Sequence, residues 1–594
     1  MNVLGVKMTS HDTGAALISG GKIVAIAEER LNRVKYSENI FPEKSIQYCL
    51  DTYGIEPSDV DLVVTDWIGD TEIEAGTLAE RYFHEHTASR FTKAKIVTIN
   101  HHDAHAATAF FCSPFDDAAI LIYDGNGDTF INNQGVRVVE TETMYRGTGT
   151  TITQISKTSH ARVGRGFPYT WGIGKLYSNL SRDYIGFGPH NEGKMMGLAA
   201  YGDDRILREF PIERWIADER GQLVCNSDID WSRGNKVLAR RSWRSFPRTV
   251  YFALRSRLRR MRATRSSDNP HIFSPIRFSQ GARDPKSTQL PDAYYSSVAY
   301  AAQKLFERFA IQIGVQLRTI TQSDNLCVAG GCALNIDANR NFLTEVGFKD
   351  IFVQPASSDC GIALGCALWG MHVTLKQPRF WVMKSASLGR PYSLDEIDTE
   401  IAGFGDVIVS HISENIADEA AKLIVEGNII GWFQGGSEYG PRALGNRSIV
   451  CDARPKDMRD VLNARVKHRE MWRPFATSML AERLGDWFNL QPSSTTAFML
   501  LCGEVREDKR ALVPSIVHVD NTCRMQTLTK EDNGIYYELV RSFEKLTGTP
   551  LVINTSFNLG GEPIVESPYD AIHTFMRTDM DYLVLEDRVV QKKK

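Results

Sequence analysis

The chain has 594 residues, more than one ordinary hydrophobic core holds, so two or three domains are expected. Its 42% hydrophobic and 24% charged residues are typical of soluble globular proteins. A net charge of −3 argues against general affinity for nucleic acids or membranes, and no apolar run reaches the roughly 18 residues of a membrane span.

Ten cysteines are scattered along the chain, several of them in apolar or small-residue surroundings. This pattern is typical of buried, reduced thiols in a cytosolic protein. The N-terminus opens directly on a strand pattern instead of the charged region and apolar core of a signal peptide. We therefore expect a cytoplasmic protein that is not exported.

The first segment, VLGVKMTSHDTGAALISGGKIVAIAEER, clusters β-forming residues between polar breaks. It predicts a β-meander whose first turn spans residues 9–13 and contains His11. A histidine in such a turn can serve as a proton acceptor or simply bond to the backbone.

Three histidines fall within the stretch NHHDAHAATAFF, which starts at residue 100. Its alanines favour a helix, and in a helix His101 and His105 share one face, where two imidazoles can bind one metal ion. His102 points elsewhere. The alternative is a polar helix start with solvated histidines. Because two ligands do not make a stable site, a metal centre needs oxygen ligands from other segments.

Strand-like runs stop at Gly, Asp or Asn in four segments, HDTGAAL, AAILIYDGNGDTF, NLCVAGGCALN and SSDCGIALGCALWG. Such turns let a backbone approach phosphate groups closely. Four of them in this order predict a nucleotide-binding fold like that of actin, sugar kinases and Hsp70. Asp124 and Asp359 lie in two of these turns. With the two histidines they form a mixed N/O ligand set suited to Fe(II), Mn(II) or Zn(II).

Residues 231–265 contain twelve Arg and Lys and no acidic residue. The segment is interpreted either as a nucleic-acid-binding arm or as a surface insertion with an amphipathic helix on an acidic body; we favour the insertion. A Pro/Ser/Gly-bearing stretch at residues 375–393 predicts the domain boundary. We place one domain at residues 1–380, with the insertion near 231–290, and a second at 395–594.

Arginines and lysines recur beside glycines and small polar residues in the second domain. They are Arg442, Arg447, Arg454, Arg465, Lys467, Arg469, Arg473 and Arg524. Clustered guanidinium groups beside turns are suited to binding carboxylates, phosphates and carbamoyl phosphate. Interdomain ion pairs are the structural alternative for any one of them.

The motifs HDTGAAL, HHDAHAA, DGNGD, EGKMMGLAAYG, GGCALN, SSDCGIALG, EYGPRALGNRSI, KHREMWRPFA and NTSFN occur in this order over nearly the whole chain. In them the chain resembles the nodulation-protein-U and cephem type O-carbamoyltransferases. The resemblance implies an α/β and α+β architecture. Its N-terminal domain would be actin-like, similar to tRNA threonylcarbamoyltransferase, and its C-terminal domain YrdC-like.

The resemblance also implies the reaction. The YrdC-like domain would form carbamoyl-adenylate from carbamoyl phosphate and Mg-ATP, releasing pyrophosphate. The N-terminal domain would then transfer the carbamoyl group to a hydroxyl of a small natural product, at a metal of the Fe(II) type or Mn or Zn. Neither nucleic acid nor membrane is an expected partner, and a homodimer is a possible assembly.

The family's functional positions match residues of this chain one by one. The metal positions match His101, His105, Asp124 and Asp359, and the histidine near the acceptor hydroxyl, a general base with an ordinary pKa, matches His11. The nucleotide positions match Gly125, Lys194, Gly330, Gly331 and Asn335. The carbamoyl phosphate and adenylate positions match Arg442, Lys467, Arg473, Arg524, Asn554 and Ser556, of which Arg442, Lys467 and Arg473 would also act in catalysis.

One departure from the family pattern follows WFQG, where many relatives have an arginine and this chain has Gly436. One anion contact is expected to be missing there. Two other classes of protein share some of these features: an actin-fold small-molecule kinase, and a binding protein directed at RNA or related to tRNA modification. The kinase is disfavoured because it needs neither the histidine pair nor an arginine-rich second domain.

Overall fold

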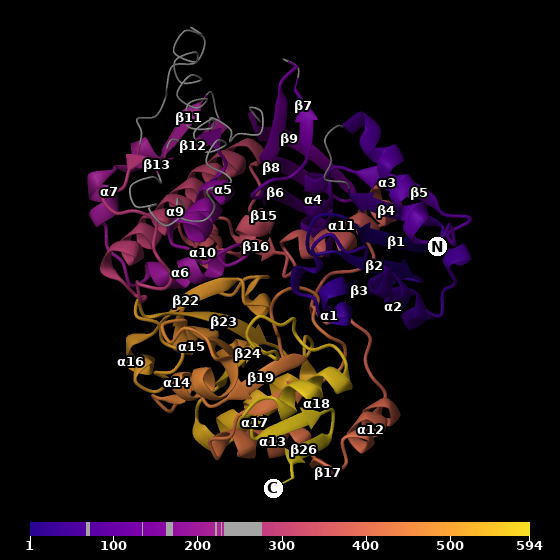
Figure 1. Ribbon diagram of the computed structural model, residues 1–594, viewed down its shortest axis with the longest axis vertical. Helices are drawn as coiled ribbons and strands as arrows, with labels where there is room; N and C mark the ends of the chain where they lie inside the picture. The colour runs from indigo at the N-terminus through magenta and orange to yellow at the C-terminus, as the bar shows by residue number, and fades with distance from the viewer. Residues whose placement is uncertain are drawn as a thin grey trace, which may run out of the picture. The chain divides into compact units, whose positions relative to one another are not determined.

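The computed structural model describes residues 1–66, 72–132, 135–161, 170–219, 222–226, 229–230 and 276–593. It forms two compact units, one made of Met1–Ser159 with Ala310–Lys594 and the other of His160–Phe309 (Figure 1). The basic segment 231–265 lies outside the described residues. The domain boundary placed between residues 380 and 395 stays a prediction.

A five-stranded sheet at the N-terminus confirms the predicted meander. Its order is β3-β2-β1-β4-β5, with β1, β2 and β3 antiparallel and β4 and β5 parallel to β1. The strands are β1 (Asn2–Lys7), β2 (Gly14–Ser19), β3 (Lys22–Ala27), β4 (Leu62–Asp66) and β5 (Lys95–Ile99). Three helices connect them: α1 (Glu28–Asn32), α2 (Glu43–Tyr53) and α3 (Glu72–His86).

A six-stranded sheet follows, with the order β16-β15-β6-β8-β7 and with β9 also paired to β8. Its strands are β6 (Asp117–Tyr123), β7 (Thr129–Ile131), β8 (Arg137–Thr148), β9 (Thr151–Ala161), β15 (Asn325–Ala329) and β16 (Asp350–Val353). The helices α4 (His101–Cys112) and α10 (Ile336–Thr344) pack against it, whereas α11 (Ile362–Trp369) packs against α4 and against β1, β2 and β4 of the first sheet. Because β6, β15 and β16 are parallel, the polar residues that follow them gather at one edge of the sheet.

The C-terminal residues form a mixed ten-stranded sheet, ordered β17-β26-β25-β18-β19-β24-β20-β23-β22-β21. The strands are β17 (Ile408–Ile412), β18 (Ile430–Phe433), β19 (Arg447–Cys451), β20 (Ala476–Leu480), β21 (Phe488–Asn489), β22 (Leu501–Val505), β23 (Thr522–Leu528), β24 (Leu551–Ser556), β25 (Tyr582–Leu585) and β26 (Arg588–Lys592). The helices are α12 (Leu394–Gly403), α13 (Ile416–Val425), α14 (Met458–Leu462), α15 (Leu484–Trp487), α16 (Glu507–Arg510), α17 (Gly534–Thr547) and α18 (Pro568–Met576).

The core of this part lies between the ten-stranded sheet and the helices α13 and α17. Ile424 and Phe543, one from each helix, pack in one buried cluster with Trp432 and Val450 of the sheet. Burying such large apolar side chains is the main stabilising contribution to the fold, because it removes apolar surface from water.

The second unit contains short strands and helices. They are α5 (Ile173–Asn179), α6 (Glu192–Ala199), α7 (Arg205–Glu209), β10 (Thr170–Trp171), β11 (Ile216–Glu219), β12 (Gln222–Asn226), β13 (Ile229–Asp230) and β14 (Ile276–Arg277). The long helix α9 (Ala293–Thr321) begins in the second unit and continues into the first, which resumes at Ala310. Its core is aromatic: the rings of Tyr184 and Phe278 lie 4.5 Å apart between centroids, and Trp215 packs beside them.

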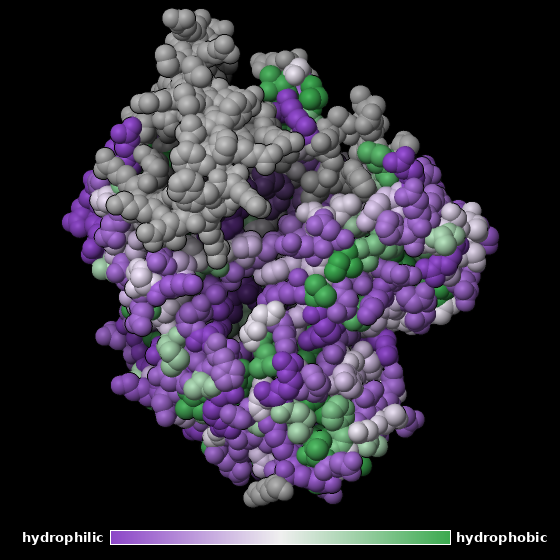
Figure 2. Space-filling view, viewed as in Figure 1, coloured by the Kyte–Doolittle hydropathy of each residue, from purple (hydrophilic) through white to green (hydrophobic). Residues whose placement is uncertain are grey.

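The architecture is therefore mixed α/β. The face drawn in Figure 2 is mostly hydrophilic, with hydrophobic residues in small separate groups. Among the helices that the structure describes, none combines the length and the apolar character needed to cross a membrane.

Candidate functional site

The helix α4 begins as the sequence predicts. The side chain of Asn100 accepts hydrogen bonds from the backbone amides of His102 and Asp103 and so caps the helix N-terminus. His101 and His105 lie one turn apart on the same face, with ring centroids 4.7 Å apart, and both are fully buried. The alternative of solvated histidines at a polar helix start is therefore wrong.

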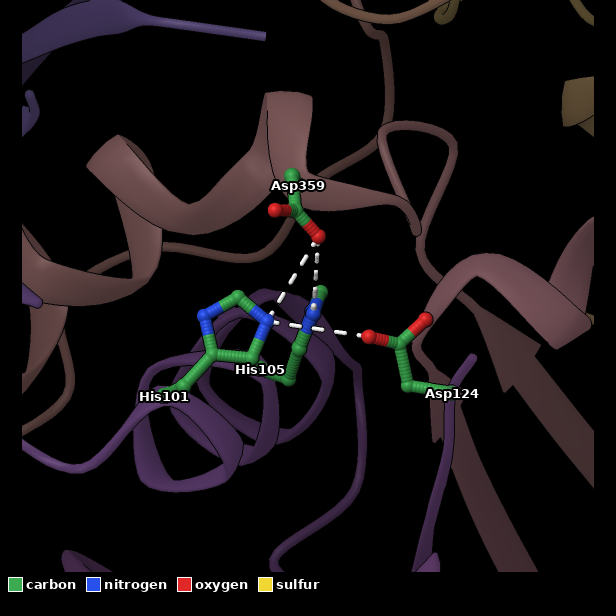
Figure 3. A group of neighbouring side chains, drawn as sticks. All are labelled: His101, His105, Asp124 and Asp359. Atoms are coloured by element: carbon green, nitrogen blue, oxygen red, sulfur yellow. Dashed lines mark ion pairs between the residues drawn. The ribbon is translucent and has the colours of Figure 1, made fainter. Parts of the chain in front are cut away.

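Asp124 and Asp359 face the two histidines (Figure 3). His101 Nε2 lies 3.7 Å from Asp124 Oδ2 and 3.5 Å from Asp359 Oδ1. His105 Nε2 lies 3.8 Å from the same oxygen of Asp359. One ligand atom from each of the four residues lies within 4.8 Å of the others. We call these four residues the His/Asp set.

A contact between two helices brings Asp359 to α4. Asp359 lies in the turn that leads into α11, and α11 packs against α4 at Gly365. A Cβ at Gly365 would lie only 2.0 Å from the carbonyl oxygen of Ala104, so only glycine allows the two backbones to approach this closely. The last glycine of the SSDCGIALG motif, Gly365, thus has a packing role.

The charges of the His/Asp set favour a bound cation. Burial opposes ionisation of Asp124, but its interaction with His101 outweighs burial and lowers the pKa of Asp124 to about 2. The pKa of Asp359 lies well below its usual range despite burial, because His101 and Lys7 stabilise the carboxylate. Both carboxylates are therefore ionised at neutral pH.

The imidazoles fit a metal as well. Among the described residues, both ring nitrogens of His105 and Nε2 of His101 are buried without a hydrogen-bond partner. Buried polar atoms normally have partners, so these unpaired atoms are what a ligand set for a metal ion requires. Two nitrogen and two carboxylate ligands suit Fe(II), Mn(II) or Zn(II).

His102 belongs to a different cluster. Its Nδ1 lies 2.7 Å from the hydroxyl of Thr143, and its Nε2 lies 4.0 Å from Glu140. Burial lowers the pKa of His102 to about 4, so the ring is neutral. Lys157 Nζ lies 2.6 Å from Glu140 Oε2 and neutralises the charge of that carboxylate. The helix therefore separates His102 from His101 and His105, as the spacing predicts.

Lys7 and Asp66 are two residues near this site that no sequence motif singles out. Both are fully buried and lie 2.8 Å apart. Asp66 also lies 2.8 Å from His101 Nδ1, and Lys7 lies 3.6 Å from Asp359. Their only sequence signal is that each is a charged residue closing an apolar strand, in GVK and VVTD.

His11 lies in the turn between β1 and β2, half-buried, with its Nδ1 3.1 Å from Asp12 Oδ2. Its Nε2 lies 4.0 Å from Asp359 Oδ2, so the turn does bring it to the His/Asp set. Burial lowers the pKa of His11, but the hydrogen bond to Asp12 and the charge of Asp359 outweigh burial and raise it to about 9. The expectation of an ordinary pKa is therefore wrong for this geometry.

The predicted nucleotide residues fall in two places. Gly125 directly follows Asp124, and the amide of Gly331 donates to Asp124 Oδ1 at 2.9 Å. Gly330, with φ of 95°, approaches the carbonyl oxygen of Tyr123, where a Cβ would lie 2.3 Å away. Asn335 caps α10 with its side chain. Lys194 lies in the second unit, on α6, with its ammonium 5.9 Å from the ring centroid of Phe187.

A group of cations lies in the C-terminal part. Burial and the charges of Arg524 and Arg473 hold the pKa of Arg442 well below its usual range. Burial also lowers the pKa of Arg524 to about 10, with Arg473 adding to the effect. Within the described part of the chain, no ion pair includes Arg442 or Arg524, and the Nε of each is buried without a partner. Such neighbouring, unneutralised guanidinium groups favour an anion.

Lys467 extends this group. Burial, together with the charges of Arg469, Arg473 and Lys35, holds the pKa of Lys467 well below its usual range. Its ammonium donates to the carbonyl oxygen and hydroxyl of Ser556, and to Asn558 Oδ1 at 3.0 Å. We call Arg442, Lys467, Arg469, Arg473 and Arg524 the cation cluster.

Asn554 contacts the segment that carries Arg442 of the cation cluster. Its side-chain amide donates to the carbonyl oxygen of Ala443 at 3.2 Å and to Ser478 Oγ at 2.8 Å. It therefore ties β24 to the segment that carries Arg442. Its Oδ1 is buried and has no partner among the residues described.

Three other arginines are occupied structurally. Arg447 is fully buried and donates to backbone carbonyls, among them those of Gln434 and Glu566. Arg454 pairs with Asp452 and Arg465 with Asp581, each at 2.7 Å. These three therefore have structural contacts, but all of their partners lie within the C-terminal part, so none of the three forms the interdomain ion pair that was the alternative.

The backbone is closely packed at Gly436, the position at which the sequence departs from the family pattern. A Cβ at Gly436 would lie 2.0 Å from the carbonyl oxygen of Gly389, so this backbone has no room for a side chain at that position. The departure read from the sequence thus lies at a close backbone contact.

The two groups of residues belong to one compact unit. Gly440, with φ of 121°, brings the segment of Arg442 against the loop that precedes Asp359, where a Cβ would lie 3.0 Å from the carbonyl oxygen of Pro355. Arg30 donates to the carbonyl oxygen of Gly440 at 2.8 Å and fixes the same contact.

Comparison with known proteins identifies the family. A model described as carbamoyltransferase N-terminus matches residues 2–95 and 87–368, and one described as carbamoyltransferase C-terminus matches residues 421–592. An uncharacterised protein of Synechocystis sp. is 33% identical, covering 100% of this chain and 97% of its own. Nodulation protein NolNO of Sinorhizobium fredii is 32% identical, covering 98% of this chain and 79% of its own.

Among solved structures, full-length HypF in its phosphate- and nucleotide-bound form aligns with a TM-score of 0.33 and 11% identity, over 62% of this chain and 54% of that chain. That value is too low to support an argument about ligands. The sequence matches decide the family: the chain belongs to the carbamoyltransferases and is an enzyme of that class.

Proposed function

We propose that the protein is an ATP-dependent O-carbamoyltransferase that runs two half-reactions at the two groups of residues. The observation that carries the proposal is the cation cluster, in which Arg442 and Arg524 have no ion-pair partner among the described residues, in the same unit as the His/Asp set. The first group suits carbamoyl phosphate and the nucleotide, and the second suits the transfer of the carbamoyl group.

The first half-reaction takes place at the cation cluster. Water cleaves carbamoyl phosphate to phosphate and carbamate, and a carbamate oxygen then attacks the α-phosphorus of ATP, so that carbamoyl-adenylate forms and pyrophosphate leaves. Arg442, Lys467 and Arg473 hold the anionic groups and stabilise the charge that moves to the leaving group. Arg524 and Ser556 complete the binding site, and Asn554 positions Arg442 through Ala443.

The second half-reaction takes place beside the His/Asp set. The acceptor hydroxyl attacks the carbamoyl carbon, the bond to the phosphate oxygen breaks, and AMP leaves. His11 takes the hydroxyl proton at Nε2, because its Nδ1 is held by Asp12. A divalent ion at His101, His105, Asp124 and Asp359, with Fe(II), Mn(II) and Zn(II) as candidates, would supply positive charge for a phosphate or an acyl oxygen. It would also offset the charge of Asp359, which helps to keep His11 protonated.

The experiment measures pyrophosphate. Purified protein with Mg-ATP should release pyrophosphate only when carbamoyl phosphate is present, and the reaction needs no knowledge of the acceptor. Release that is independent of carbamoyl phosphate, or formation of ADP instead of AMP, would contradict the proposal. ADP would favour the actin-fold kinase.

We further propose the finer architecture: an actin-like domain at residues 1–380 and a YrdC-like domain at 395–594. Polar residues at the ends of β1, β4, β6 and β15 support the first, because ligands of such sheets bind beyond the carboxyl ends of the strands. Gly125, Gly330, Gly331 and Asn335 are proposed to contact the nucleotide of the adenylate. The nucleotide role of Lys194, which belongs to the second unit, stays a prediction from the resemblance. The acceptor is a hydroxylated small molecule, and the enzyme is proposed to act in the cytoplasm.

A further inference from the structure

A buried ion pair stands directly behind the His/Asp set. Lys7 is the last residue of β1 and Asp66 the last of β4, and these strands are parallel neighbours in register at Val6 and Thr65. Both side chains are fully buried, and Lys7 Nζ lies 2.8 Å from Asp66 Oδ2. Buried ion pairs contribute little net stability, because desolvation of the charges offsets their attraction. The pair therefore calls for a role beyond stability.

Asp66 determines which nitrogen of His101 is available. The same oxygen that contacts Lys7, Asp66 Oδ2, lies 2.8 Å from His101 Nδ1. A carboxylate can only accept, so Nδ1 carries the proton and donates. This leaves Nε2, the atom that faces Asp124 and Asp359 at 3.7 and 3.5 Å, as the nitrogen that would bind a metal ion.

Lys7 acts on the opposite ligand. Its ammonium lies 3.6 Å from Asp359 Oδ2, whereas the two histidines face Asp359 Oδ1. Lys7 thus occupies one oxygen of Asp359 and leaves the other toward the imidazoles. The charges of Lys7 and Asp66 cancel each other, so the pair adds no net charge to the two carboxylates of the His/Asp set, those of Asp124 and Asp359. Two carboxylate ligands suit a divalent cation.

We infer that Lys7 and Asp66 are positioning residues of the metal site: Asp66 fixes the tautomer and orientation of His101, and Lys7 fixes Asp66 and turns Asp359. The inference rests on the proposed function, since it requires that the His/Asp set binds a metal. His105 has no such partner for either ring nitrogen among the residues described, so the pair acts on one of the two histidines only.

The test measures Co²⁺ binding to the full chain by visible absorption and by competition with a chelator. In Asp66→Asn the amide can either donate to His101 Nδ1 or accept from it, so the tautomer is no longer fixed. The Co²⁺ affinity should fall about 10- to 100-fold, the usual effect of losing such a partner, and the visible spectrum should change. The variant Lys7→Met/Asp66→Asn removes the unpaired lysine as well and should show the same loss while folding normally.

The matched control is Asp103→Asn. Asp103 is on the same helix, but its carboxylate accepts from the hydroxyl of Tyr145 at 2.9 Å. This variant should bind Co²⁺ as the unmodified protein does. Melting curves of all metal-free variants show how much of any change is a loss of stability.

The outcomes separate the two proposals. If the unmodified protein does not bind Co²⁺, or His105→Ala binds it equally well, the metal site itself is wrong. If the unmodified protein binds Co²⁺, His105→Ala does not, and both Asp66 variants keep the unmodified affinity and spectrum, only the positioning role is wrong. A lower melting temperature with unchanged Co²⁺ binding would likewise make the pair purely structural.

Discussion

At the scale of single residues, Arg442 lies among cations and has no carboxylate partner in the described part of the chain. Arg442→Met removes a repulsion, so the melting temperature of the ligand-free protein should stay the same or rise. Pyrophosphate release should be lost, because the variant lacks a charge-assisted contact worth about 1.5–3 kcal/mol, or about 10- to 150-fold in affinity. Inorganic phosphate should raise the melting temperature of the unmodified protein and not that of the variant.

Arg465→Met is the matched control for this prediction. Arg465 pairs with Asp581 at 2.7 Å and belongs to the arginines with a structural role. Its loss should leave pyrophosphate release intact and should lower the melting temperature slightly. A marked loss of stability in Arg442→Met, with pyrophosphate release preserved, would make Arg442 a structural residue too.

His11 provides a second prediction at this scale, because it lies 4.0 Å from Asp359 and outside the cation cluster. His11→Asn should keep pyrophosphate release and should slow carbamoyl transfer by about 10² to 10⁴, the usual effect of losing a general base. The measurement is AMP and pyrophosphate release with and without acceptor. If both fall together with the melting temperature, His11 is only a structural turn residue.

The sequence predicts part of the site residue by residue, for physical reasons that can be stated. The spacing of His101 and His105 is a local property of one helix, and Asp124 and Asp359 follow strand ends, so both signals are visible in the sequence. Lys7 and Asp66 are 59 positions apart and meet only because β1 and β4 are neighbours. Pairing between distant strands leaves no local pattern.

At the scale of elements, the contact between α4 and α11 fixes the distance between the histidines and Asp359. Gly365→Ala should destabilise the protein by about 1–3 kcal/mol or more, since its Cβ would lie 2.0 Å from the carbonyl oxygen of Ala104. It should also abolish Co²⁺ binding, because the helices must separate. Melting curves and Co²⁺ titration test both.

Gly403→Ala is the control for that helix glycine. Gly403 lies in α12, where a Cβ meets no atom within 4 Å. Because Gly403 is the last residue of α12, an alanine there should leave the stability of the protein unchanged or raise it slightly, and Co²⁺ binding should not change. Unchanged Co²⁺ binding in Gly365→Ala would show that the α4–α11 contact does not set the geometry of the site.

The elements near the site also show which features of the fold can be predicted from local sequence patterns. The helix at residues 101–112 and the meander β1–β2–β3 follow from composition and periodicity, which act within a few residues. The order of the strands in the ten-stranded sheet does not follow from local patterns. Its strand β18 pairs both with β19, which is near in the sequence, and with β25, which is more than 140 positions away. The same reason hides the packing of Gly440 on Pro355 from the sequence.

At the scale of the whole molecule, the two groups of residues lie in one compact unit, yet their chemistry is separate: ligands for a cation in one, ligands for anions in the other. The chain matches both the N-terminal and the C-terminal carbamoyltransferase family models. The division of the reaction between them is therefore testable by removing one group at a time.

His105→Ala and Arg442→Met should give opposite results. His105→Ala should lose Co²⁺ binding, because the imidazole of His105, whose two buried nitrogens have no hydrogen-bond partner among the described residues, is removed from the set of ligands. It should keep the pyrophosphate release that depends on carbamoyl phosphate. Arg442→Met should keep Co²⁺ binding and lose pyrophosphate release. His102→Gln is the matched control for the first, since His102 bonds to Thr143 and should not affect Co²⁺. If either variant lost both activities while its melting curve stayed normal, the two half-reactions would share one site, and the assignment of adenylate formation to the cation cluster and transfer to the His/Asp set would be wrong.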